Sequence, residues 1–203
     1  MLFIRINNNL LEQAMVLFDS TFSNTSLGNK SIGDYIIPKR GKNLLSKDAI
    51  LGDVPVVAGG LEPSTYHNIA NTKAPVLAIS ASGANAGFVS LWNSPIWSSD
   101  SSYIDSSMTS NVYFWYVLLK RRQREIYDAQ TGSAQPHIYP QHIAAMSLVN
   151  LDPDEVERYN TLVTPLFEMI GDNTKQNRQL IKLRESILPR LLRGDIDISH
   201  IEI

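Results

Sequence analysis

The last fifty residues constrain the fold of this chain most strongly, because they carry the pattern of one very long helix. The pattern begins at Asp152 and runs with little interruption to Gly194. A helix over this range has about 42 residues and a length of roughly 60 Å, whereas ordinary globular helices have about 11–12 residues. A chain of 203 residues has little core with which to cover such a helix. Its apolar side therefore predicts a partner.

Residues at both ends of this segment predict a helix with defined limits. Asp152 can accept hydrogen bonds from the free amides of the first turn, and Pro153 has no amide to leave unpaired. Glu155 lies three residues after Asp152 and completes a pattern like a capping box. At the other end, Arg193 and Gly194 are typical of a helix terminus.

An apolar seam with a seven-residue repeat runs along the predicted helix. Its polar members cluster at 173–184, where polar residues usually fix the register or the number of strands at some cost in stability. Pro165 and Pro189 lie within the pattern, and each is a potential kink. We expect dimerisation through this seam, and packing on the chain's own body is the alternative. The seam consists of Val156, Tyr159, Val163, Leu166, Ile170, Asn173, Asn177, Leu180, Arg184, Ile187 and Leu191.

The composition limits the classes of protein that this chain can be. Hydrophobic residues make up 43% and charged residues 19%, an ordinary balance for a soluble globular protein. The chain has no cysteine, which excludes disulfides and thiolate metal sites. No apolar run reaches the length of about 18 residues that a membrane span needs, and Arg5 follows the apolar start too soon for a signal peptide. We therefore expect a cytoplasmic protein.

Charge is distributed unevenly along the chain. The formal net charge is −2, which by itself argues weakly against nucleic acid as a partner. Residues 28–150, however, carry ten Lys and Arg against eight Asp and Glu, whereas residues 151–203 carry seven against ten. A protein that reads DNA needs a local basic surface rather than a basic total. The middle region is therefore the place to look for one.

The pattern of residues predicts an α+β fold: a short N-terminal helix, a loop-rich mixed body and the long helix. Apolar residues at spacings of three and four predict the first helix over 8–24. From residue 32 to 110, Pro and Gly recur between short β-prone runs. We expect strands at 34–37, 55–58, 76–80, 87–91 and 143–150, a helix at 111–129 and a polar loop at 130–137.

A search for catalytic motifs finds none. The four histidines have no metal-ligand spacing, and there is no nucleophile elbow or phosphate-binding loop. The chain also lacks an Asp/Asn-Pro-Pro-Tyr/Phe methyltransferase motif and a nuclease cluster. This profile favours a binding module. Two alternatives are an enzyme of unrecognised type that uses His67, His137 and nearby carboxylates, and a dimeric adaptor that does not bind DNA.

Short runs of residues along the chain together resemble one known family. In the body they are Leu27-Gly28, Ile32–Tyr35, Gly41-Lys42, Val54–Gly60, Ile79–Gly87, Trp97–Asp100 and Gly132–His137. The run Leu183–Ile196 looks like the end of the family's long helix, and Leu11–Phe22 looks like the stub of a preceding repeat's helix. These runs resemble the specificity subunits of type I restriction-modification systems, over almost the whole chain.

The resemblance implies a domain organisation. Residues 1–27 would form an N-terminal helix that packs with a coiled coil, and 28–150 a target-recognition domain that binds DNA. Residues 151–203 would form a long helical spacer and dimerisation region. Members of the family usually have two recognition domains, each followed by a long helix, whereas this chain has one of each. The chain therefore looks like a half-length subunit, which implies a homodimer; a fragment of a longer subunit is the alternative.

The resemblance also implies the function. The chain would recognise double-stranded DNA by sequence without a catalytic site of its own. It would direct partner adenine-N6 methyltransferase subunits and a restriction subunit to a bipartite site. S-adenosylmethionine, ATP and Mg²⁺ would bind those partner subunits and not this chain.

A basic run in a glycine-containing loop is the first candidate for DNA binding. Lys39, Arg40, Lys42 and Lys47 are suited to contact phosphates, which position a protein on DNA without reading its sequence. The alternative is an ordinary solvated loop.

Polar loop residues are the candidates for reading bases. Tyr66, His67 and Asn68 offer a ring for stacking together with donors and acceptors, and Asn can pair bidentately with adenine. Ordinary turn chemistry is the alternative for them. Further candidates are Ser82, Asn85, Ser101, Ser102, Gln135 and His137.

Overall fold

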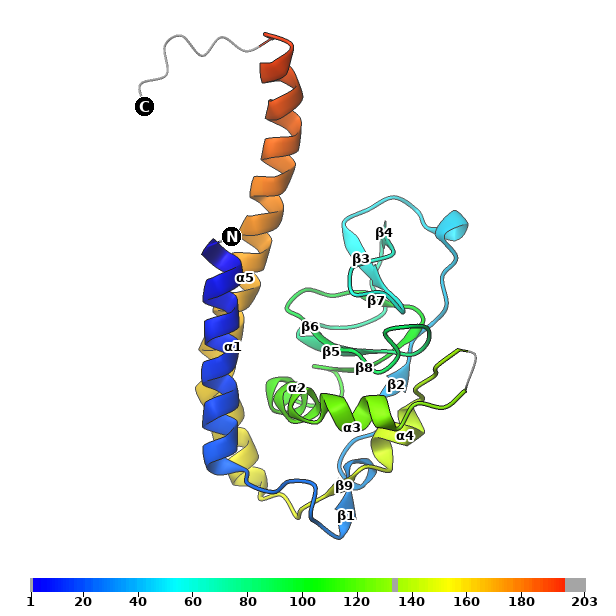
Figure 1. Ribbon diagram of the computed structural model, residues 1–203, viewed down its shortest axis with the longest axis vertical. Helices are drawn as coiled ribbons and strands as arrows, with labels where there is room; N and C mark the ends of the chain where they lie inside the picture. Colours follow the sequence, from blue (N-terminus) through cyan, green and yellow to red (C-terminus); the bar gives the residue numbers. More distant parts are fainter. Residues whose placement is uncertain (1, 133–134, 196–203) are drawn as a thin grey trace.

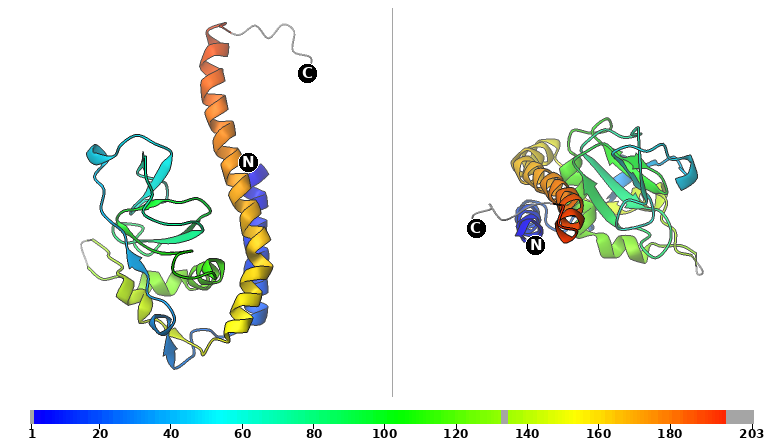
Figure 2. Two further views of the ribbon diagram at one scale, coloured as in Figure 1. Left: turned by 180° about the vertical axis from the view of Figure 1, so that it is seen from behind. Right: turned by 90° about the horizontal axis from the view of Figure 1, so that it is seen from above.

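Two helices lie side by side along one flank of the molecule, and the rest of the chain forms a loop-rich body against them (Figures 1 and 2). The computed structural model describes residues 2–132 and 135–195. Helix α1 (Leu2–Thr21) and helix α5 (Pro153–Leu192) run in opposite directions, and α5 continues well beyond the first turn of α1 (Figure 1). The predicted α+β fold with a long C-terminal helix is confirmed.

Helix α5 is one continuous helix of 40 residues. At its start, Asp152 Oδ1 accepts a hydrogen bond from the amide of Asp154 at 2.9 Å, and Pro153 occupies the first helical position. At its end, Gly194 has a φ of +74°, the left-handed conformation that favours glycine after a helix. The predicted limits of this helix are therefore confirmed. Residues 196–203, which the sequence analysis included in the helical region, lie outside the described residues.

Aromatic side chains join the two helices to the body. Phe18 of α1 and Phe22, the residue after α1 ends, pack against Phe114 of α2 (Val112–Arg121) and Tyr159 of α5. The ring centroids in this cluster lie 5.1–6.2 Å apart. The Tyr159 hydroxyl donates a hydrogen bond to the Ala14 carbonyl oxygen at 2.9 Å. Every residue of α2 from 112 to 119 is buried. Helix α2 therefore forms the centre of the core, between the helix pair and the sheets of the body.

Among its described residues, the body contains three small sheets. In the largest, the strands lie in the order β2-β8-β5-β6, and all neighbours are antiparallel. A second sheet has the order β4-β3-β7, and β1 pairs with β9 where the chain enters and leaves the body. The strands are β1 (Lys30–Ser31), β2 (Lys39–Arg40), β3 (Val54–Val57), β4 (Thr65–His67), β5 (Val76–Ser80), β6 (Val89–Trp92), β7 (Trp97–Ser98), β8 (Ser101–Asp105) and β9 (Ser147–Leu148).

Two of the predicted strands are wrong. Residues 34–37 do not form a strand, because the chain turns at η1 (Ile32–Asp34), where Asp34 accepts a hydrogen bond from the Ser31 amide at 2.8 Å. The predicted strand at 143–150 is shortened to β9, because α4 (Pro140–Ala144) begins with proline in its first turn and occupies the residues before it. The strands expected at 55–58, 76–80 and 87–91 correspond to β3, β5 and β6.

The predicted helices also differ from the observed ones. The first helix starts at Leu2 and ends at Thr21, whereas residues 8–24 were expected. The expected helix at 111–129 divides into α2 and α3 (Gln123–Asp128) at Arg122. Its side chain is buried and donates hydrogen bonds to Glu125 and to the Ser147 carbonyl oxygen. The Arg122 side chain therefore ties this break to β9.

Besides the packing of α2, side chains of the body contact α5 near its middle and in its upper half. Near the middle of the helix, the Asn93 side-chain amide donates a hydrogen bond to the Phe167 carbonyl oxygen and lies against Gly171. Further up, the Arg178 guanidinium lies over the ring of Tyr66, 5.7 Å from its centroid. Lys182 Nζ lies 3.4 Å from an oxygen of Asp53, so the tip of the body reaches the upper half of the helix.

No helix within residues 2–132 and 135–195 is long and apolar enough to cross a membrane.

Candidate nucleic-acid interface

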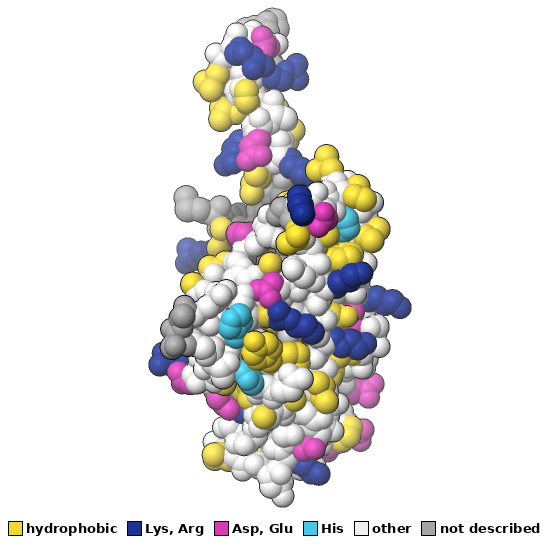
Figure 3. Space-filling model, turned by 90° about the vertical axis from the view of Figure 1, so that its right-hand side faces the viewer, with side chains coloured by type: hydrophobic (Ala, Val, Ile, Leu, Met, Phe, Trp, Pro, Cys, Tyr) yellow, Lys and Arg dark blue, Asp and Glu magenta, His cyan; other side chains and the backbone are white. Residues whose placement is uncertain are grey.

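The predicted basic run lies on an exposed edge of the largest sheet. Lys39 and Arg40 form β2, the edge strand, where they pair with β8. Lys42 follows in the next loop, and Lys47 lies in η2 (Ser46–Asp48). All four side chains are exposed. Figure 3 shows Lys and Arg side chains gathered across the middle of the body on the face that points away from the helix pair.

The four cations differ in their electrostatic partners. Arg40 Nη2 lies 2.5 Å from Asp100 Oδ1, with both side chains partly exposed. Within the part of the chain that the structure describes, Lys39, Lys42 and Lys47 form no ion pair. The lysines therefore keep their positive charge available to a ligand, whereas the charge of Arg40 is balanced locally.

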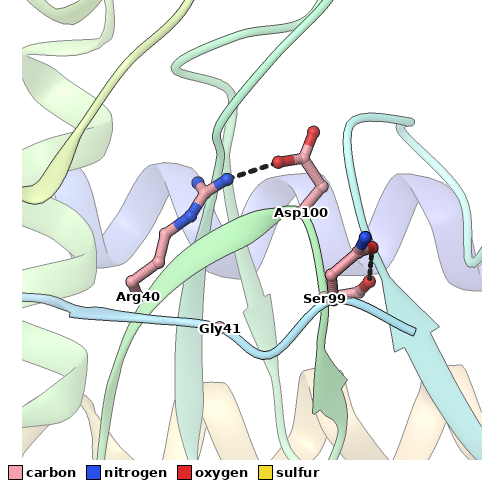
Figure 4. A pocket seen from close by; sticks show the side chains of 5 residues that line it. Arg40, Gly41, Ser99 and Asp100 are labelled. Atoms are coloured by element: carbon pink, nitrogen blue, oxygen red, sulfur yellow. Dashed lines mark hydrogen bonds and ion pairs between the residues drawn. The ribbon is translucent and has the colours of Figure 1, made fainter.

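Arg40 and Asp100 lie in an open polar pocket of about 320 Å³ (Figure 4). Gly41, Asn43 and Ser99 complete its lining. The Ser99 hydroxyl donates to Asn43 Oδ1 at 3.4 Å and accepts from the Leu44 amide at 3.0 Å, which holds the loop after β2 against the body.

Two features fix the loop after β2 in this position. A Cβ added to Gly41 would lie 2.5 Å from the carbonyl oxygens of Ser98 and Ser99, so the close approach of the two chain segments requires glycine. The indole of Trp97, which is buried, donates a hydrogen bond to the Lys42 carbonyl oxygen at 2.8 Å. The loop that carries Lys42 is therefore held in a fixed position against the body.

His137 lies close to this pocket, because it pairs with Ser82, whose side chain contacts Asp100. His137 forms isolated β-bridges with Ser82 and with Thr131, and the Ser82 hydroxyl donates a hydrogen bond to Asp100. Gln135 is exposed and His137 is half-buried. Two predicted candidates, Ser82 and His137, are thus connected to Arg40 through Asp100 and the Ser82–His137 bridge.

Two residues of this surface were missed by the sequence analysis. Asp100 binds both Arg40 and Ser82. The sequence feature that could have identified it is a carboxylate in the short turn between two β-prone runs. Tyr139 is 43% exposed, and its ring is stacked on that of His137 with centroids 5.9 Å apart. The available signal was the spacing of two residues between the aromatic rings in an extended segment, which places both on one side of the chain.

Three predicted base readers are buried, and the structure corrects their roles. His67 is 5% exposed, accepts a hydrogen bond from the Ile50 amide at 3.0 Å through Nδ1 and packs edge-on against Trp97. Ser101 and Ser102 are 0% and 1% exposed, because they alternate along the central strand β8 and cannot reach a ligand. These residues support the fold of the body.

The remaining loop candidates lie away from the pocket or only at its margin. Tyr66 is 40% exposed, but its ring lies against Arg178 of α5 rather than beside the basic run. Asn68 follows it and is exposed. The Asn85 amide donates a hydrogen bond to the Gly59 carbonyl oxygen at 3.4 Å and is half-buried. Of these three, Tyr66 and Asn68 are exposed, and Asn85 is half-buried.

The predicted dimerisation seam divides into a covered half and a bare half. Val156, Tyr159 and Val163 are buried under α1 and α2 of the same chain, and Leu166 and Ile170 are partly buried against this core. The expectation that the whole seam needs a partner chain is wrong for this half, because α1 folds back along α5. The upper members, which are not in this core, are Asn177, Leu180, Ile187 and Leu191.

Within residues 2–132 and 135–195, no group of three or more His, Asp or Glu side chains is arranged to hold a metal ion.

Known proteins share the fold and part of the sequence of this chain. No protein-family model matches it. The type I restriction enzyme MjaIX specificity subunit of Methanocaldococcus jannaschii is 32% identical over 99 residues, which are 48% of this chain and 23% of that protein. The crystal structure of the type I restriction-modification S subunit from M. genitalium aligns with a TM-score of 0.67 at 19% identity, covering 93% of this chain and 55% of that one.

These comparisons confirm the predicted resemblance to specificity subunits of type I restriction-modification systems. The sequence relation covers 99 residues, and the fold is shared with the solved S subunit over 93% of this chain. The chain spans about half the length of the solved subunit and matches 23% of the curated relative.

Proposed function

We propose that this chain is the sequence-specific DNA-recognition subunit of a type I restriction-modification complex. The observation that carries the proposal is the fold shared with a solved S subunit across 93% of the chain, together with the sequence relation to a specificity subunit. The exposed lysines of β2, of the loop after it and of η2 support it, because a DNA reader needs a local basic surface.

In this proposal, the chain positions other proteins on DNA and has no catalytic site of its own. An adenine-N6 methyltransferase subunit and a restriction subunit would carry out the chemistry. S-adenosylmethionine, ATP and Mg²⁺ would bind those subunits. The complex would act in the cytoplasm, where its DNA substrate lies.

The upper half of α5 supports a homodimer. Leu180, Leu183 and Leu188 are 54%, 53% and 49% exposed, and this part of the helix extends beyond α1 (Figure 1). Antiparallel pairing of two copies would cover these side chains and close with two-fold symmetry. Two identical recognition domains would then read inverted half-sites, separated by about one helical turn or roughly 10 bp. The expected target is a bipartite palindrome.

A gel-shift experiment with random-sequence duplex DNA tests the proposal. The purified chain is mixed with the duplex alone and together with the methyltransferase subunit of a type I restriction-modification system. We expect a shifted complex that weakens steeply as salt rises, because released counterions drive binding. Sequencing of methylated adenines in cells that carry the system should then give a gapped palindrome. A dimer that shifts no DNA in either mixture would identify an adaptor and contradict the proposal.

A further inference from the structure

Arg40 and Asp100 form an ion pair in the polar pocket beside the exposed lysines. Arg40 Nη2 donates to Asp100 Oδ1 at 2.5 Å, and the other carboxylate oxygen of Asp100 accepts a hydrogen bond from the Ser82 hydroxyl (Figure 4 shows the ion pair). The Ser82 backbone forms a bridge with His137. The Asp100 carboxylate therefore orients the Arg40 guanidinium, and the Ser82 hydroxyl in turn holds the Asp100 carboxylate.

The pair is poorly suited to contact a phosphate. A phosphate that approaches Arg40 also approaches the negative charge of Asp100, which is 33% exposed, so the attraction and the repulsion largely cancel. The neighbouring lysines Lys39 and Lys42 have no such partner within the described part of the chain. They are better placed to neutralise phosphates and to release counterions.

The same pair is well suited to contact a base pair. In the major groove, guanine presents the acceptors N7 and O6, and its cytosine presents an amino donor. The guanidinium of Arg40 has five N–H donors in a planar fork, of which the ion pair with Asp100 uses part. The carboxylate of Asp100 is acceptor-only and is partly exposed. One arginine and one aspartate thus match the donors and acceptors of one G·C pair.

The pocket around the pair is built to keep this geometry. Gly41 packs against the carbonyl oxygens of Ser98 and Ser99, and the Ser99 hydroxyl binds both Asn43 and the Leu44 amide. A contact group that is already ordered in the free protein loses less entropy on binding. A flexible surface arginine would need none of these restraints.

We propose that Arg40 and Asp100 together read one G·C base pair from the major groove, and that Ser82 positions Asp100 for this contact. This inference rests on the proposed DNA-recognition function and assigns a base-reading role to Arg40, for which the sequence alone predicted a phosphate contact. Phosphate contacts then fall to Lys39, Lys42 and Lys47.

Selection from a randomised duplex pool, with the methyltransferase partner present, tests the assignment. Arg40→Lys keeps the charge and removes the fork, so it should relax one G·C position by roughly 5- to 140-fold and leave the slope of affinity against salt unchanged. Lys42→Ala should select the wild-type motif at lower affinity, with a salt slope smaller by about 1. Arg124→Lys is the matched control, because Arg124 forms an exposed ion pair with Asp128 on α3, outside the pocket.

Asp100→Asn should change sequence preference and affinity for random DNA in opposite directions. It should relax the same position of the motif and at the same time strengthen binding to random DNA, because a negative charge is removed from the surface. Each variant is first checked for an unchanged circular-dichroism spectrum and urea midpoint. If the wild-type protein enriches a motif that Arg40→Lys enriches equally, this inference is overturned and the proposed function stands. If the wild-type protein enriches no sequence, both are overturned.

Discussion

The contact between Asn93 and Gly171 sets how the body sits on α5, and it can be tested by a double-mutant cycle. Asn93 donates one hydrogen bond to the Phe167 carbonyl oxygen, and its Oδ1 accepts one from the Tyr113 hydroxyl at 3.4 Å. A Cβ added to Gly171 would have its three nearest neighbours within Asn93, including the side-chain Cβ at 2.7 Å and Cγ at 3.0 Å. The Asn93 side chain therefore occupies the space that a side chain at position 171 would need.

The magnitude of the Gly171→Ala effect follows from three contributions. Alanine is about 1 kcal/mol more favourable than glycine inside a helix. Against this, forcing atoms into a packed contact costs about 1–3 kcal/mol, and the displaced hydrogen bond of Asn93 costs about 1 kcal/mol. We expect a net loss of about 1–3 kcal/mol in the free energy of unfolding. In an Asn93→Gly background no side chain opposes the new methyl group, so Gly171→Ala should there stabilise by about 1 kcal/mol.

The assay is urea denaturation of the four proteins, followed by circular dichroism at one fixed protein concentration. A fixed concentration is needed because self-association would add to the apparent stability. The expected coupling energy is about 2–4 kcal/mol, with a change of sign between the two backgrounds. If Gly171→Ala has the same effect in both backgrounds, glycine is not required here by the close approach of Asn93, and the reasoning is refuted.

Three further predictions concern the tyrosines of the core, a corrected site residue and the bare half of α5. Burial, assisted by Glu168 at Tyr113, raises the pKa of Tyr113 and of Tyr116 from 10.0 to about 12. Their contribution to stability should be full below pH 10 and be lost as the pH rises towards 12, measured as the urea midpoint against pH; a midpoint unchanged over that interval would contradict the burial argument. His67→Ala should cost about 1–3 kcal/mol of stability, because the amide that it binds loses its partner, and a folded variant should keep the wild-type DNA motif. Leu180→Asp combined with Ile187→Asp should convert dimers to monomers in sedimentation experiments without loss of helix, and an intact dimer would place the interface elsewhere.

The sequence was sufficient to predict α5 because the signals for a helix of this kind are local. The start of the helix is set by the Asp152 carboxylate and the Pro153 ring, and its end by the glycine at 194. Each of these residues acts within one turn of its own end of the helix. What covers α5 is decided by tertiary contacts. Whether α1 folds back on the same chain or packs on another depends on Phe18 and Phe22 meeting Phe114, far away in the sequence. The heptad pattern is the same in both cases, so it could not distinguish them.

The same limit explains which site residues were predicted correctly. A charged residue is expected at the surface, because burial of an unpaired lysine has a high free-energy cost. The four predicted cations are exposed. Polar neutral residues carry no such constraint. Ser101 and Ser102 are as polar as Ser82, but they lie on a central strand, and only the register of β8 against β5 shows it. Asp100 was missed for a related reason: its role depends on Arg40, 60 residues away in the sequence, and no local pattern links an arginine on one strand to a carboxylate beyond another. A basic run in a sequence therefore indicates where a DNA-binding surface lies, whereas the side chains that read bases are identified by their partners in three dimensions.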